Sequence, residues 1–106
     1  MLIAMTGFAI CAVALGSLMV ANNSGVRAGI TGIVYHQSSN SIGVDYAVVD
    51  PVGTNVTKFM IQSSLDLQTW TNLTPTITLT GSGSGEASDF ASASAKFYRM
   101  YLVNFQ

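Results

Sequence analysis

The chain has 106 residues, a formal net charge of −1 at pH 7 and only 8% charged residues, against about 25% in ordinary soluble domains. This length allows one domain with at most one appendage. The charge leaves no basic surplus to neutralise phosphates, which excludes nucleic acid as an expected partner. The single cysteine, Cys11, excludes an intramolecular disulfide and a cysteine-based zinc site.

The first 21 residues form an apolar run, and the first ionisable side chain after it is Arg27. Good helix formers and the absence of proline predict a helix over residues 1–23, with roughly 30 Å of length in its apolar part. A helix that is apolar on every face must be buried in a membrane or among copies of itself. No basic segment precedes the run, so we interpret it as part of the mature protein rather than a signal peptide.

Small residues within this run would let neighbouring helices approach closely. We therefore predict that the run is an assembly interface between copies. The residues assigned to this interface are Leu2, Ile3, Gly7, Phe8, Ile10, Val13, Leu15, Gly16, Leu18 and Met19.

The periodicity changes after the polar segment 22–25, where turn chemistry ends the predicted helix. Alternating apolar residues then predict several strands, and the last has large apolar groups on both faces, as expected of a central strand. The glycine-rich segment 81–85 is expected to be a loop, and 86–94 an irregular connection or weak edge strand. The main strands are predicted at 26–36, 42–48, 54–63, 74–80 and 95–105.

These elements predict an α+β fold, with the helix at 1–23 followed by a small antiparallel β-sandwich head domain at 24–106. The second half also resembles fibronectin-III-like modules of secreted bacterial surface proteins. The resemblance covers less than half of the chain and implies a sandwich fold and an extracellular location, with Trp70 and an aromatic at 97 or 98 in the core. The matching positions are Ile61, Gln62, Ser63, Ser64, Leu67, Trp70, Leu73, Lys96, Phe97, Tyr98 and Arg99.

In outline, an uncharged N-terminal helix followed by a β domain resembles a type IV pilin, particularly the archaeal kind. Bacterial type IV pilins generally carry a glutamate at the fifth mature position, where this chain has Met5. The departure favours the archaeal-like variant or an unrelated filament or virion subunit over bacterial-style assembly.

Residues for catalysis or cofactor binding are sparse. The single histidine, His36, has no nucleophile motif near it, and the acidic residues do not match a calcium loop. The run at 81–85 lacks the lysine of a phosphate loop. We therefore expect no enzyme activity, no cofactor and no metal. Three Asn-x-Ser/Thr triplets, beginning at Asn22, Asn55 and Asn72, are candidate glycosylation sites.

These observations predict a structural subunit of an extracellular, pilus-like helical filament. Its helices would wait in a membrane and then pack in the filament core, with the β domains outside. The partners would be copies of the same chain, and a surface ligand stays open. Two alternatives remain: a single-span membrane-anchored surface or adhesion module, and a virion or capsid-associated structural protein.

Overall fold

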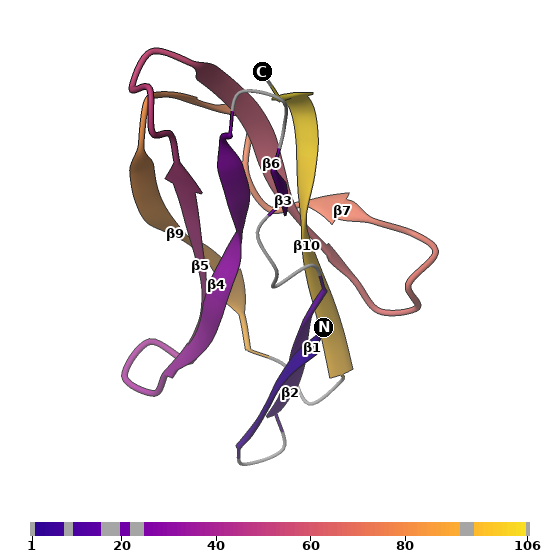
Figure 1. Ribbon diagram of the computed structural model, residues 1–106. Helices are drawn as coiled ribbons and strands as arrows, with labels where there is room; N and C mark the ends of the chain where they lie inside the picture. The colour runs from indigo at the N-terminus through magenta and orange to yellow at the C-terminus, as the bar shows by residue number, and fades with distance from the viewer. Residues whose placement is uncertain (1, 8–9, 16–19, 22–24, 92–94, 106) are drawn as a thin grey trace.

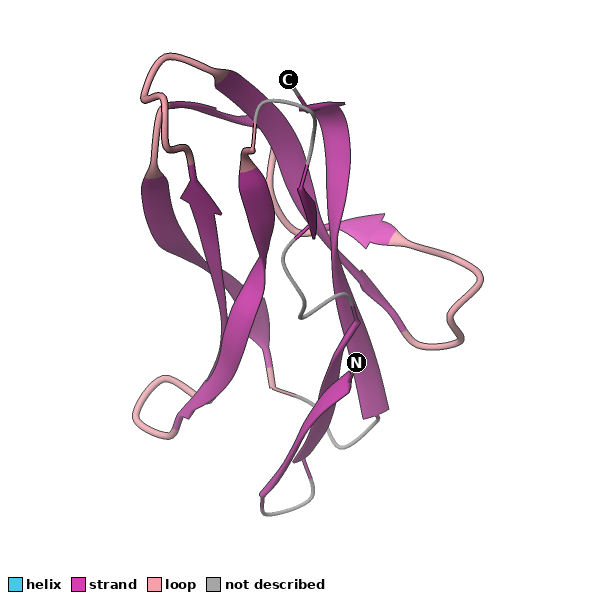
Figure 2. Cartoon of the chain, in the orientation of Figure 1, coloured by secondary structure: helices cyan, strands magenta, loops and turns pink. Residues whose placement is uncertain are grey.

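The computed structural model describes residues 2–7, 10–15, 20–21, 25–91 and 95–105. Within these ranges every regular element is a β-strand (Figure 2). The strands form two sheets, and the sheets lie against each other as two layers (Figure 1).

The larger sheet has six strands, and its long central pair is formed by β10 and β6. These two strands run antiparallel from the pair Phe97–Ser64 to the pair Phe105–Thr57, with an irregularity between Leu102 and Asn104. On its other side β10 pairs in parallel with β2, which forms a hairpin with β1. The strands of this sheet are β1 (Leu2–Gly7), β2 (Ile10–Leu15), β10 (Ala95–Phe105), β6 (Val56–Ser64), β7 (Thr71–Asn72) and β8 (Ile77–Thr80).

The smaller sheet has four antiparallel strands in the order β3-β4-β5-β9. Its centre is the hairpin of β4 and β5, and β9 pairs along β5 from Ser41–Phe90 to Val48–Gly83. The strands are β3 (Val20–Ala21), β4 (Arg27–His36), β5 (Ser41–Val49) and β9 (Gly83–Phe90).

The core lies between the two sheets and is filled from alternate positions of their strands. The ring of Tyr46 meets that of Phe59 edge to face, with centroids 5.2 Å apart, and so joins β5 to β6. The buried apolar residues are Val26, Ala28, Ile30, Ile42, Val44, Val48, Phe59, Ile61, Ala87 and Tyr98.

The predicted α+β class is wrong, because the described residues of the apolar N-terminal run form the strands β1, β2 and β3 and not a helix. Periodicity alone does not separate a buried helix from short buried strands when the run is apolar throughout. Gly7 also disfavours a helix by about 1 kcal/mol relative to alanine. The choice between helix and strand is decided by a tertiary contact, because β2 pairs with β10 from Ala95 to Tyr98 and its backbone forms hydrogen bonds there.

The expected glycine-rich loop is also different in the structure. The chain turns at 81–82, and Gly83 begins β9, which continues to Phe90 along the edge of the smaller sheet. The prediction that 95–105 is a central strand is confirmed, since β10 lies between β2 and β6. The predicted domain boundary between 23 and 24 falls at residues outside the described ranges.

Candidate functional site

The free edges of the two sheets differ in charge. In the described strand order, β1 forms one edge of the larger sheet. The other edge is formed by β7 and β8, which each pair with β6. The sequences of these edge strands, LIAMTG, TN and ITLT, contain no charged residue. In the smaller sheet the edge strand β9 contains Glu86 and Asp89, and the opposite edge strand β3 has only two residues.

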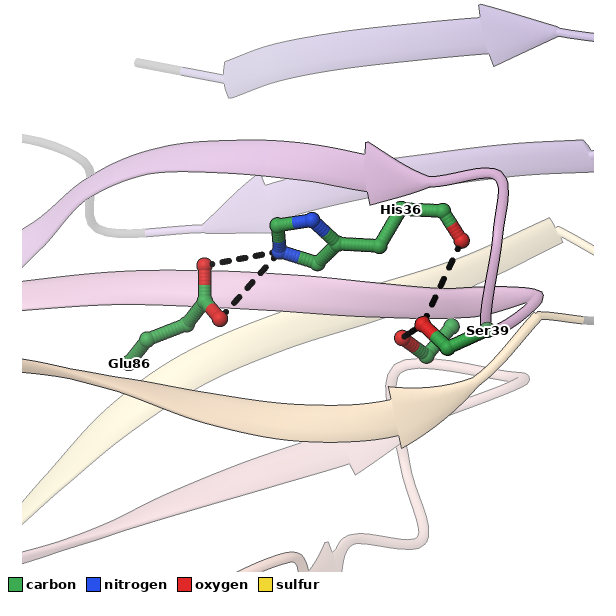
Figure 3. Close-up of polar contacts among 4 residues, drawn as sticks. His36, Ser39 and Glu86 are labelled. Atoms are coloured by element: carbon green, nitrogen blue, oxygen red, sulfur yellow. Dashed lines mark hydrogen bonds and ion pairs between the residues drawn. The ribbon is translucent and has the colours of Figure 1, made fainter.

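A polar cluster lies on the outer face of the smaller sheet (Figure 3). The His36 Nε2 atom is 3.2 Å and 3.0 Å from the two carboxylate oxygens of Glu86. Both side chains pass over Gly43, where an added Cβ would overlap them. The absence of a side chain at Gly43 therefore allows this pair to form across β5.

The electrostatics of this cluster extend to Asp45, which faces Glu86 across the β5–β9 ladder. Partial burial and a hydrogen bond with Glu86 raise the pKa of Asp45, while the hydrogen bond with His36 lowers the pKa of Glu86. The nearby Ser39 hydroxyl donates to the His36 carbonyl oxygen at 3.5 Å, not to the imidazole. Among the described residues, the cluster therefore has the acid and the base of a hydrolytic triad but no nucleophile hydrogen-bonded to the ring.

A second cluster, on the outer face of the larger sheet, is built around Arg99. Its guanidinium carbon lies 4.1 Å from the ring centroid of Trp70 and 5.6 Å from that of Tyr101. The Arg99 Nε atom donates to Gln62 at 2.8 Å, and the Gln62 amide donates to Asn72 at 2.7 Å. Trp70 is thus half-buried beneath an arginine on the outer face, not in the core as the resemblance implied.

A third feature is a recess at the end of the sandwich where β9 ends and β10 begins. It consists of two adjoining pockets of about 380 and 300 Å³, which share Leu73 and Asp89. We call these two pockets together the end recess. At its inner wall the Asp89 carboxylate accepts hydrogen bonds from Lys96 at 2.9 Å and from the Tyr98 hydroxyl at 2.8 Å.

Serine and threonine make up half of the residues that line the end recess. The larger pocket is lined by Ser63, Ser64, Thr69 and Thr71, together with Asp66. The smaller pocket is lined by Ser39, Ser41 and Ser88, with Asn72 and Phe90 at its side. The Asp66 carboxylate accepts hydrogen bonds from the backbone of Thr69 and of Gln68, which lower the pKa of Asp66 and hold the loop that forms one wall.

Six of the ten residues predicted for assembly are described by the structure, and all six lie in the N-terminal hairpin. Leu2, Ile3 and Gly7 belong to β1, and their register partners are Leu15, Ala14 and Ile10 on β2, which also contains Val13. The remaining predicted positions, Phe8, Gly16, Leu18 and Met19, lie outside the described residues. The described residues of the hairpin thus form one continuous pair of strands at the edge of the larger sheet.

The three candidate glycosylation sites differ in setting. Asn55 is half-buried and its amide nitrogen donates to Asp50 at 3.0 Å, so the atom that would carry a glycan is engaged. Asn72 is exposed on β7, where its side-chain oxygen accepts from Gln62. Asn22 lies outside the described residues. Asn72 therefore remains the most accessible of the described candidates.

Sequence reasoning did not find the Arg99 cluster or the end recess. Alternation along β10 places Arg99 and Tyr101 on one face, but nothing local indicates that Trp70 comes from a distant loop to meet them. The Asp89–Lys96 pair is likewise formed across two sheets. Among the described residues, no group of three or more His, Cys, Asp or Glu side chains is arranged to hold a metal ion.

No helix in the described ranges is long and apolar enough to cross a bilayer. Comparison of the chain with protein-family models, with curated proteins and with solved structures found no match in any of the three.

Proposed function

We propose that the chain is a structural subunit of an extracellular homopolymer, in which copies join edge to edge through the larger sheet. The observation that carries this proposal is the uncharged sequence of the strands at both of its edges. An edge strand presents unpaired backbone donors and acceptors, and proteins that stay monomeric usually protect such edges with charge, proline, bulges or short length. The five-residue stretch from Leu2 to Thr6 in β1 contains neither a charged residue nor a proline.

The edges of the smaller sheet differ from those of the larger sheet in a way that supports the proposal. Its edge strand β9 carries Glu86 on the outer face and the inward-facing Asp89, and β3 is short. These are recognised protections against edge pairing. The smaller sheet therefore has a protective feature in each of its terminal strands. The larger sheet has an uncharged six-residue edge strand in β1, and its other edge consists of the short strands β7 and β8, which also lack charge.

Joining β1 of one copy to the opposite edge of the next would be a head-to-tail contact between two different surfaces. Such heterologous contacts generate open chains unless the rotation closes a ring. The backbone hydrogen bonds of the new ladder need no charged side chains, in keeping with the scarcity of charge in the whole chain. The hairpin formed by β1 and β2 thus takes the assembly role through strand pairing instead of helix packing.

The test uses one carboxylate at each edge. Ala4→Glu places it in the middle of β1, and Thr78→Glu places it on β8 opposite Lys58, which offers a partner within the sheet. Ser84→Glu, on the protected edge strand β9, is the matched control. Molar mass is measured by light scattering over a concentration series, with electron microscopy of the largest species and circular dichroism as the folding check.

We expect the wild-type chain and Ser84→Glu to form species that grow with concentration. Each single-edge variant should be a monomer alone, and an equimolar mixture of the two should give a dimer, since each keeps one intact edge. A wild-type chain that stays monomeric at every concentration would overturn the proposal. The proposal would also be overturned if Ala4→Glu prevented assembly and Thr78→Glu did not. That result would mean that copies pair symmetrically, β1 against β1.

A further inference from the structure

The end recess has the size of a small-ligand site. Its two pockets, of about 380 and 300 Å³, lie at the lower limit of pockets that hold small molecules, about 300–1,000 Å³. They share Leu73 and Asp89 and therefore adjoin. This arrangement suits a ligand made of at least two small units.

The charge of the recess selects against anions. Its charged groups are Asp66, Asp89 and Lys96, which sum to one negative charge. Lys96 is already paired with Asp89 at 2.9 Å, and the Asp66 carboxylate accepts backbone hydrogen bonds from its own loop. Among the described lining residues, neither a phosphate nor a carboxylate ligand would find an unengaged cation.

The lining instead offers neutral hydrogen bonding. Serine and threonine hydroxyls donate and accept with freely rotating protons, and Asn72 adds an amide. The Ser39 and Ser41 hydroxyls lie 2.8 Å apart and bond to each other, so they form a paired donor and acceptor at the rim. A ligand rich in hydroxyl groups could replace or extend such bonds at little cost.

Phe90 supplies the apolar part of the site. Its side chain is 84% exposed, the largest fraction among the exposed large apolar residues of the described chain, and it borders the smaller pocket. An exposed phenyl ring contributes nothing to the core and presents a flat face. The apolar C–H face of a sugar ring is a matching surface for such a ring, while the sugar hydroxyls meet the serines.

We propose that the end recess binds a neutral oligosaccharide, one sugar ring against Phe90 in the smaller pocket and the next in the larger pocket. The site lies away from the β1 edge, but Thr71 and Asn72 of its lining form β7, at the edge that the assembly proposal pairs with β1. Binding is therefore measured on the Ala4→Glu variant, whose β7 edge is unchanged, as well as on the wild-type chain, so that a failure of binding is distinguished from a failure of assembly.

Isothermal titration calorimetry on the full chain provides the test. The probes are mono-, di- and tetrasaccharides of β-1,4-linked glucose, of α-1,4-linked glucose and of β-1,4-linked N-acetylglucosamine, with an acidic oligogalacturonate and a serine-rich peptide for comparison. We expect at least one neutral series to bind with a dissociation constant on the order of 1 mM or tighter. Affinity should rise from the mono- to the disaccharide and change little beyond it.

Two variants locate the site. Phe90→Ala should weaken binding about tenfold or more, whereas Val52→Ala, another exposed apolar residue outside both pockets, should leave it unchanged. Thr71→Phe, which fills the larger pocket, should remove the gain from the second sugar ring while the monosaccharide still binds. The proposal is overturned if no neutral saccharide binds, if only the acidic saccharide or the peptide binds, or if Phe90→Ala binds as the wild type does.

Discussion

The carboxylate of Asp89, on β9 of the smaller sheet, accepts a hydrogen bond from the buried hydroxyl of Tyr98, on β10 of the larger sheet. The two atoms are 2.8 Å apart, and the Lys96 ammonium lies 2.9 Å from the same oxygen. Burial, reinforced by the Asp89 carboxylate, raises the pKa of Tyr98 well above its ordinary value. Tyr98 is therefore a permanent donor that ties the two sheets together at the end recess.

Removing this hydroxyl should destabilise the fold. For Tyr98→Phe we expect a loss of about 2 kcal/mol in the free energy of unfolding, the usual value for a hydrogen bond to a charged group. Urea denaturation followed by circular dichroism measures it. The control is Tyr101→Phe, whose ring is half-exposed on the outer face and which should change stability by less than about 0.5 kcal/mol. Equal effects of the two variants would contradict the assigned role.

The Arg99 side chain should be sensed by Trp70, which is the only tryptophan in the chain. Arg99→Ala removes the guanidinium that covers the ring at 4.1 Å, so the fluorescence emission of Trp70 should shift to longer wavelength. The loss of stability should be about 1 kcal/mol for a partly exposed cation–π contact. Arg99→Lys should recover little of it, because lysine lacks both the planar stack and the Nε bond to Gln62. Full recovery by lysine would show that charge alone matters.

Gly81 and Gly53 form a matched pair for testing backbone strain. Both have positive φ, of 76° and 89°, so alanine costs about 1–2 kcal/mol at either position. At Gly81 a Cβ would also lie 2.9 Å from the Gly53 carbonyl oxygen, whereas at Gly53 it would meet open space. We expect Gly81→Ala to be the more destabilising in urea. Equal losses would show that the backbone shifts without cost.

Thr57 offers a stabilising substitution. Its side chain is fully buried, and its hydroxyl oxygen has no hydrogen-bond partner within the described structure. Valine has nearly the same shape without the polar atom, so Thr57→Val should raise the free energy of unfolding by about 1 kcal/mol. The exposed Thr78→Val is the comparison and should be close to neutral. A destabilised Thr57→Val chain would mean that the hydroxyl is satisfied in solution.

Ionisation of Asp50 should account for part of the loss of folding stability at acid pH. Hydrogen bonds from the side chain and backbone of Asn55, and from Val52, lower its pKa below the ordinary value of 3.8. The folded state therefore favours the carboxylate. The stabilisation that ionised Asp50 gives the folded state is complete above pH 3.8. It is lost as the pH falls through the lower pKa that Asp50 has in the folded state.

The measurement is unfolding free energy against pH for the wild type and Asp50→Asn. The variant should be less stable at neutral pH, and the difference between the two should shrink as the pH falls below 3.8. Asp66, whose pKa is lowered in the same direction, should leave a residual acid dependence in the variant. A difference that stays constant with pH would contradict the role of Asp50.

Much of the β domain could be predicted because its strands alternate clearly. Along β10, Tyr98, Met100 and Leu102 belong to or pack on the core, while Arg99 and Tyr101 lie on the outer face. A strand has a period of two, so local sequence is sufficient to divide its faces. The central position of β10 followed from the same pattern, since large apolar groups lie on both of its faces.

The sites were less accessible to sequence reasoning. Each of them joins residues from separate strands: His36 lies 50 positions from Glu86, and Arg99 lies 37 positions from Gln62. Nothing in the local sequence around Ser88 or Phe90 indicates that they face Asn72 across a recess. The glycine-rich start of β9 was expected to be a loop, because glycine has low strand propensity by itself.

By itself, the sequence determined that the N-terminal run is apolar and uncharged, that it must be covered by something apolar, and that the residues after it form a small β-sandwich. Only the tertiary structure decided that the run forms strands, because an apolar segment satisfies its backbone hydrogen bonds as a helix or by pairing with a neighbour. Here the neighbour is β10, whose open side accepts β2 between Ala95 and Tyr98. That pairing leaves β1 as an uncharged edge strand, and it thereby moves the proposed assembly interface from helix packing to strand pairing.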